Sequence, residues 1–167
     1  DTYPAAQDPY NPKYWFWMGR GWREKIETYV PRGGEGETGV FFCPSDPRSE
    51  EKYDSTSYAY SMAFYHSPEQ IDSMTSLTDN YKNAVPTIPQ QSSQVQWPSR
   101  KILPGEWYAN HTAFTGDKGW FGKGGKRLYL FADGHVEYLD ASEIISANDG
   151  NPNPNLTHNG IRGYDVK

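Results

Sequence analysis

The stretch RLYLFADGHVEYL, residues 127–139, constrains the fold of this chain more than any other segment. Two runs of alternating apolar side chains flank the pair Asp133-Gly134, which is typical of the two-residue type I′ turn of a β-hairpin. Such a turn pairs Phe131 with Val136. Because side chains alternate along each strand, we expect one buried face on this hairpin. Its expected core residues are Tyr129, Phe131, Val136 and Tyr138.

An amphipathic helix is expected near the N-terminus. Asn11-Pro12 predicts its start, with Asn as the N-cap and Pro in the first turn. Pro31 and Gly33-Gly34 predict its end. Between them, large apolar side chains recur at spacings of three and four, which is typical of one helix face that packs on a core. These residues are Trp15, Met18, Trp22, Ile26 and Tyr29.

Three other segments have the pattern of short strands. Residues 57–64, SYAYSMAF, alternate large and small side chains, as in a half-buried strand. Residues 40–47 are a short apolar strand or extended segment that ends at Pro44 and Pro47, because proline cannot donate to a β-ladder. Residues 100–107 are the next strand candidate.

Two short helices and a long loop complete the expected elements. Residues 68–74 are compatible with a short helix, and Asp140 with Glu143 forms a capping box for another over 141–147. The glycine-rich segment 108–126 is expected to be a surface loop.

The length of 167 residues fits one domain, 1–167, with an irregular tail over 148–167. Aliphatic side chains are scarce, but 16% of the residues are aromatic, and aromatic side chains bury large areas. We therefore predict an α+β fold in which an N-terminal helix packs on a small antiparallel sheet with long irregular loops.

Charge and cysteine content exclude several classes of protein. The net charge of -5 is spread along the chain without a basic block, so nucleic acid is not an expected partner. Cys43 is the only cysteine and cannot form an intrachain disulfide; we expect a small buried side chain there. No run is long enough to span a membrane. Because the chain starts at Asp1 and not at Met, we expect that a preceding segment was removed.

Catalytic and metal sites have weak support in the sequence. His135 lies beside Asp133, on the hairpin face opposite the expected core, and His111 could join them as a transition-metal ligand in a metal-dependent hydrolase. No HExxH motif is present, so we expect no catalytic residues and no cofactor.

Calcium is an alternative for the C-terminal tail, where oxygen-bearing side chains occupy alternate positions. They are Asp149, Asn151, Asn153 and Asn155. The bidentate Glu of an EF-hand is lacking, so a solvated Asn-Pro loop is the favoured interpretation.

A carbohydrate- or ligand-binding module is an alternative from a different class. The chain has six Trp and 13 Tyr, and exposed coplanar aromatic rings would suit such a ligand. The candidates are Trp107, Tyr108, Trp120 and Phe121.

Several stretches in order resemble the bacterial type II secretion pseudopilin-like proteins, which have a prepilin-type N-terminus and a C-terminal signature of His, nine residues and Asp-Gly. The stretches are FFCPSDP (41–47), SYAYSMAF (57–64), WPSRKILPGEW (97–107) and LFADGHVEYL (130–139). The signature's Asp-Gly matches Asp133-Gly134, whereas Lys123 stands where it has His. The motif residues are Cys43, Pro44, Ser45, Asp46, Pro98, Ser99, Glu106, Asp133, Gly134 and His135.

The resemblance implies a non-enzymatic cell-envelope protein. It implies the globular part of a longer precursor, whose N-terminal hydrophobic helix anchors it in the inner membrane after cleavage by a prepilin peptidase. The expected location is the periplasmic face of that membrane or outside the cell. The expected partners are other pseudopilin-like subunits or components of the secretion system.

Overall fold

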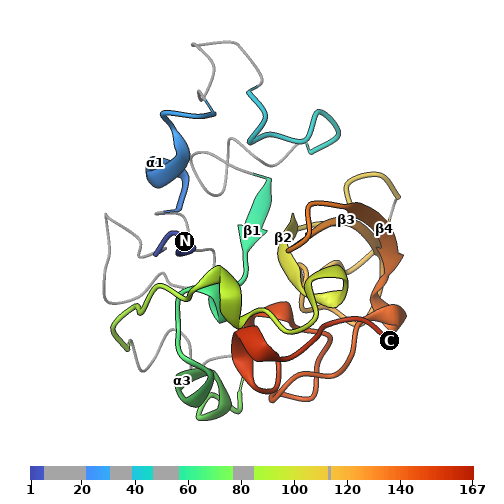
Figure 1. Cartoon of the computed structure of the whole chain (residues 1–167). Helices are drawn as coiled ribbons and strands as arrows, with labels where there is room; N and C mark the ends of the chain where they lie inside the picture. The colour runs from blue at the N-terminus through green and yellow to red at the C-terminus, as the bar shows by residue number, and fades with distance from the viewer. Residues whose placement is uncertain (6–21, 31–38, 47–56, 77–84, 113) are drawn as a thin grey trace.

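A computed structural model describes residues 1–5, 22–30, 39–46, 57–76, 85–112 and 114–167. Its centre is a four-stranded antiparallel sheet in the order β1-β2-β3-β4, which is also the order in the sequence (Figure 1). The strands are β1 (Tyr58–Tyr60), β2 (Ile102–Glu106), β3 (Lys126–Phe131) and β4 (Val136–Asp140). The small antiparallel sheet, with few helices and irregular loops, confirms the predicted mixed class.

Among the residues that the structure describes, two short α-helices accompany the sheet: α1 (Trp22–Ile26) and α3 (Pro68–Asp72). Ser67 and Gln70 form a capping box at the start of α3, where Pro68 occupies the first turn, so the helix predicted at 68–74 is confirmed. The other helical elements are single 3₁₀ turns at Met62–Phe64, Ser92–Gln94, Pro98–Arg100, Ala141–Glu143, Pro154–Leu156 and Gly160–Arg162. The Asp140–Glu143 capping box is present, but it starts a 3₁₀ turn and not the helix predicted at 141–147.

The hairpin of β3 and β4 has a different register from the predicted one. Leu130 pairs with Val136 and Tyr129 with Glu137, one residue away from the expected pairs. Tyr129 and Phe131 are buried as predicted, whereas Val136 is 58% exposed. Tyr138 is also exposed, so the prediction that both β4 residues belong to the core is wrong.

The turn explains this shift. Within this turn only Gly134 has a positive φ, of 93°, whereas a type I′ turn also needs a positive φ at Asp133. The Gly134 N–H donates to the Phe131 carbonyl at 2.9 Å, and the Phe131 N–H donates to the His135 carbonyl. The loop thus has three residues, with glycine in the left-handed position, and this extra residue moves the register by one.

Within the described residues, the helix near the N-terminus ends at Ile26, earlier than the end predicted at Pro31. Trp22 is buried and its ring lies 5.6 Å from Phe41 and 5.7 Å from Tyr60. Tyr29, in contrast, is 85% exposed, so it does not share the packed face. The predicted start at Asn11-Pro12 and the stripe residues Trp15 and Met18 lie outside the described residues.

Two predicted strands differ from the structure. The described part of 40–47 contains turns and no strand, closed by hydrogen bonds such as that from the Asp46 N–H to the Cys43 carbonyl. Residues 57–64 form β1 and then a 3₁₀ turn, because the Ser61 hydroxyl caps Met62–Phe64. The strand predicted at 100–107 is confirmed as β2.

The C-terminal segment packs against the rest of the chain although it has no regular strand or α-helix after β4. Leu156 and Ile161 are fully buried beside α3 and the 3₁₀ turn at Met62–Phe64, and Figure 1 shows this part in orange to red below the sheet. Lys101 is also fully buried and lies 3.3 Å from Asp165. A hydrogen bond from Ile102 N–H to the Asp165 carboxylate, 2.8 Å, joins this segment to β2.

His66 makes the stability of this fold depend on pH. His66 is 1% exposed, its ring lies tilted against that of Tyr65 at 4.9 Å, and burial lowers its pKa from 6.5 to about 4. The unfolded chain therefore binds a proton between these values that the folded chain does not, so stability falls as pH drops below about 6.5. We expect the free energy of unfolding of His66→Phe, measured with urea, to fall by about 2 kcal/mol less than that of the parent protein when the pH is lowered from 7 to 5. Parallel losses in both proteins would contradict a neutral buried imidazole.

Candidate functional site

Cys43, Glu106 and His111 meet at the end of β2, although Cys43 is far from the other two in the sequence. Glu106 is the last residue of β2, Cys43 lies in the turns before β1, and His111 follows β2 in the next loop. Backbone contacts set this arrangement, because Ser57 accepts the Cys43 N–H on its hydroxyl and donates its own N–H to the Phe41 carbonyl, each at 2.9 Å.

The three side chains converge on the imidazole Nε2 of His111. This atom lies 3.4 Å from Cys43 Sγ and 3.1 Å from Glu106 Oε1. Cys43 and Glu106 are buried, at 4% and 0% exposure, whereas the His111 side chain is 36% exposed. The sulfur and carboxylate atoms of the cluster are therefore buried, and the histidine is on the side that faces solvent.

Glu106 is held from several directions. Its Oε2 accepts the backbone N–H of Leu128 at 2.9 Å, and its Oε1 also faces Asn110 Nδ2 at 3.4 Å. The His111 ring packs edge-on against Tyr138 at 6.3 Å. The carboxylate thus has a fixed orientation that does not depend on its contact with His111.

Burial and nearby negative charges raise the pKa values of two side chains in this part of the molecule, Cys43 and Tyr58. Burial raises the pKa of the Cys43 thiol, and a hydrogen bond with Glu106 and the negative charges nearby raise it further. Tyr58, which pairs with Glu106 across β1 and β2, has a pKa raised to about 12, first by burial and then by Cys43 and Glu106. A thiolate nucleophile needs the opposite shift, so the geometry and the electrostatics disfavour cysteine catalysis.

The donor set suits a metal better than an acid–base relay. In a nucleophile–His–carboxylate triad, the two partners of the imidazole contact different ring nitrogens. Here Cys43 and Glu106 both face the same Nε2 of His111. Thiolate, imidazole and carboxylate are all ligands of Zn²⁺.

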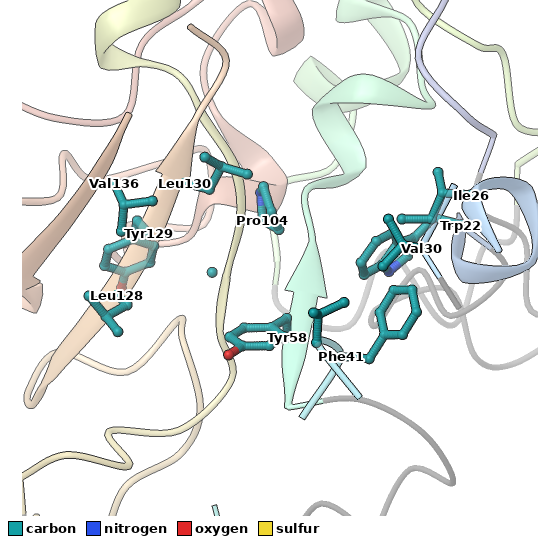
Figure 2. A pocket seen from close by; sticks show the side chains of 12 residues that line it. Trp22, Ile26, Val30, Phe41, Tyr58, Pro104, Leu128, Tyr129, Leu130 and Val136 are labelled. Carbon is teal, nitrogen blue, oxygen red and sulfur yellow. The ribbon is translucent and has the colours of Figure 1, made fainter. Parts of the chain in front are cut away.

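An apolar groove lies beside this cluster, with a volume of about 380 Å³. Figure 2 shows Trp22, Ile26 and Val30 at one side of it and Leu128 and Leu130 of β3 at the other. The remaining lining residues are Val40, Phe41, Tyr58, Pro104, Gly105, Tyr129 and Val136. The groove is thus lined both by the helical segment near the N-terminus and by strands of the sheet.

The three predicted metal candidates do not form one group, because His111 belongs to the cluster with Cys43 and Glu106. Asp133 and His135 hydrogen-bond to each other at the hairpin tip, and this bond raises the pKa of His135 and lowers that of Asp133. His135 stacks on Phe131 at 4.3 Å and lies 3.3 Å from Glu137, so His135 shares a face with the core residue Phe131 and the predicted opposite placement is wrong. Among the described residues, the group that could hold a metal ion includes His111 but neither Asp133 nor His135.

The calcium candidates in the tail use their oxygens within the protein. Asn155 Oδ1 accepts the Met62 N–H, Asn153 Oδ1 accepts the Asn155 N–H, and both Asp149 oxygens accept from Asn151 and Asn153. Asn153 and Asn155 are each 2% exposed, so the expectation of a solvated loop is wrong. The alternating residues form a hydrogen-bonded segment in which Asn153 and Asn155 are buried and Asp149 and Asn151 are partly exposed.

The aromatic rings considered for ligand binding lie inside the molecule. Trp107, Tyr108 and Trp120 are 3%, 7% and 0% exposed, and only Phe121 of the four is partly exposed. The loop that carries them therefore covers the sheet and does not present a flat aromatic surface. This burial removes the observation that favoured a carbohydrate-binding module.

A buried ion pair holds that loop. Arg127, in β3, contacts the Asp117 carboxylate and donates to the Gly124 carbonyl at 3.0 Å. Asp117 also accepts the N–H groups of Ala109, at 2.6 Å, and Gly119, at 2.9 Å. The segment predicted as a surface loop is thus fastened to the sheet by one carboxylate.

The motif stretches of the sequence contact each other in space. The Asp133 N–H donates to the Pro98 carbonyl and the Ala132 N–H to the Lys101 carbonyl, so the hairpin tip docks on the Pro98–Arg100 turn, which contains Ser99. The turn of Cys43, Pro44, Ser45 and Asp46 meets β2 through Glu106. Lys123, where the signature has His, is exposed.

Sequence reasoning named each member of the cluster but not their association. Cys43 and Glu106 were motif residues and His111 was a ligand candidate for a different site. The feature that indicates the cluster is the pairing of β2, which ends at Glu106, with the strand that follows the Cys43 turn.

No family model, curated protein or solved structure matches this chain. Within the described residues, no helix has both the length and the apolar character needed to cross a membrane.

The Asp117–Arg127 pair predicts a strong effect of one substitution. Asp117→Asn leaves the buried guanidinium without its counter-charge, so we expect a loss of about 3 kcal/mol in the free energy of unfolding. Urea unfolding followed by tryptophan fluorescence measures it, because Trp107 and Trp120 lie in this region. Glu137→Gln, on the exposed strand β4, is the control and is expected to stay within 0.5 kcal/mol, roughly the range for surface changes. Equal effects would contradict the role of the buried pair.

Proposed function

We propose that this chain is the soluble head of a type II secretion pseudopilin-like subunit that acts in filament assembly or protein secretion at the cell envelope. One observation carries the proposal: the stretches that give the resemblance form one connected unit. The Cys43 turn contacts the end of β2 through Glu106, and the hairpin at Asp133 contacts the turn at Pro98. Segments that are separate in the sequence thus contact each other in the folded protein.

The apolar groove supports the same proposal. Pseudopilin-like heads are expected to place an N-terminal helix on a small antiparallel sheet, and Trp22, Ile26 and Val30 line the groove opposite β3 (Figure 2). In this proposal the groove is the place where the N-terminal segment of this same chain packs on the sheet. Its role is to connect the sheet to a membrane-anchoring helix encoded before Asp1.

In this function the chain acts as a structural subunit and not as an enzyme. Its partners are other pseudopilin-like subunits or components of the secretion system, and it works on the periplasmic face of the inner membrane or outside the cell. The function requires no cofactor.

The test is the processing of the full precursor. The gene, including the codons before Asp1, is expressed in bacteria with and without an active prepilin peptidase. We expect an inner-membrane precursor that becomes shorter only when the peptidase is active, measured by fractionation and mass spectrometry of the new N-terminus. Cleavage by an ordinary signal peptidase, with release of the whole chain, would contradict the proposal.

A further inference from the structure

The cluster of Cys43, Glu106 and His111 has features that the proposed function does not use. Its donor atoms are a thiol sulfur, an imidazole nitrogen and a carboxylate oxygen, all within 4.8 Å of one another. Cys43 and His111 are 68 positions apart in the sequence, whereas Glu106 ends the strand that directly precedes the loop of His111. A hydrogen-bonded Glu–His pair explains only two of these donors.

The distances in the cluster are close to those between ligands of one metal ion, with one inside and one slightly below the expected range. With metal–ligand bonds of about 2.0–2.3 Å, two ligands of a tetrahedral zinc ion are about 3.3–3.8 Å apart. His111 Nε2 is 3.4 Å from Cys43 Sγ and 3.1 Å from Glu106 Oε1. Small side-chain movements therefore suffice to place all three atoms around one ion.

Contacts outside the cluster already orient two of the donors. The Ser57 hydroxyl accepts the Cys43 N–H, which fixes the backbone that carries the thiol. The Leu128 N–H binds Glu106 Oε2 and leaves Oε1 turned towards His111. In protein metal sites, hydrogen bonds of this kind from neighbouring groups orient the ligands. Here Ser57 and Leu128 supply them.

We propose that Cys43, Glu106 and His111 bind a zinc ion. Sulfur and nitrogen donors in a small, partly buried site favour zinc over magnesium or calcium, which prefer oxygen ligands. On binding, the sulfur–hydrogen bond of Cys43 is replaced by a sulfur–zinc bond and the proton is released to solvent. Three protein ligands leave the fourth position of a tetrahedral ion for water.

The ion would fasten three parts of the molecule together. Cys43 lies in the turns before β1, Glu106 ends β2 and His111 belongs to the loop that covers the sheet. Zinc would thus cross-link segments that otherwise meet through side-chain contacts. This role does not depend on the proposed pseudopilin function, and either can fail without the other.

The test uses the purified full chain, stripped of metal with a chelator and titrated with Zn²⁺ and with Co²⁺. We expect one ion per chain, a rise in melting temperature on adding Zn²⁺, and a visible Co²⁺ spectrum with the absorption of a tetrahedral thiolate complex. His111→Ala should weaken Zn²⁺ binding by at least about 100-fold, since loss of a residue that merely supports a ligand costs roughly 10- to 100-fold. Cys43→Ser should remove the thiolate absorption.

His135→Ala is the matched control, because His135 also lies between two carboxylates, Asp133 and Glu137. It should leave the affinity unchanged. His111 is partly exposed, so His111→Ala is expected to fold even where Cys43→Ser does not, and near-ultraviolet circular dichroism checks this. Absence of binding to the parent, full binding by His111→Ala, or an equal loss in His135→Ala would overturn the proposal.

Discussion

The buried pair of Lys101 and Asp165 is the contact on which the position of the C-terminal segment depends. Lys101 is fully buried, and burial lowers its pKa while Asp165 opposes that shift. Its ammonium group also donates to Thr157 Oγ1 at 2.7 Å, and Asp165 accepts the N–H of Ile102. One pair therefore ties the C-terminal segment to the strand beside it. A lone charge at this depth would be strongly destabilising, so the segment and the strand must fold together.

Carboxylates fill the same structural role elsewhere in the molecule. Asp117 accepts the N–H of Ala109 while it pairs with Arg127, and Glu106 accepts the N–H of Leu128 beside His111. Each buried carboxylate takes a backbone N–H from another segment in place of a regular β-ladder. This explains how the described part of the chain, with four short strands and two short α-helices, holds its loops in defined positions. It also explains how an acidic residue comes to face a thiol and an imidazole.

Local patterns allowed part of this structure to be predicted. The helix at α3 and the strand β2 followed from composition, and the Asp140–Glu143 capping box from residue type and spacing. The hairpin was expected, but its register was not, because Asp-Gly also fits a three-residue loop that needs a positive φ only at Gly134.

Long-range contacts could not be predicted in the same way. The burial of Trp120 depends on a loop that Asp117 and Arg127 fasten, and the burial of Asn155 on its bond to Met62. The Cys43–Glu106–His111 cluster depends on the pairing of β1 with β2 and on the turn that precedes β1. Sequence patterns show the type of each residue, but only the fold shows which distant polar groups become neighbours.

The most direct test of the central claim is hydrogen exchange of Asp165→Asn, a nearly isosteric change that removes one charge of the buried pair. We expect the backbone amides of residues 144–166 to lose protection, while those shared between β3 and β4 keep theirs, because the hairpin has its own ladder. Unchanged protection across 144–166 would contradict the claim that this pair holds the C-terminal segment on the sheet.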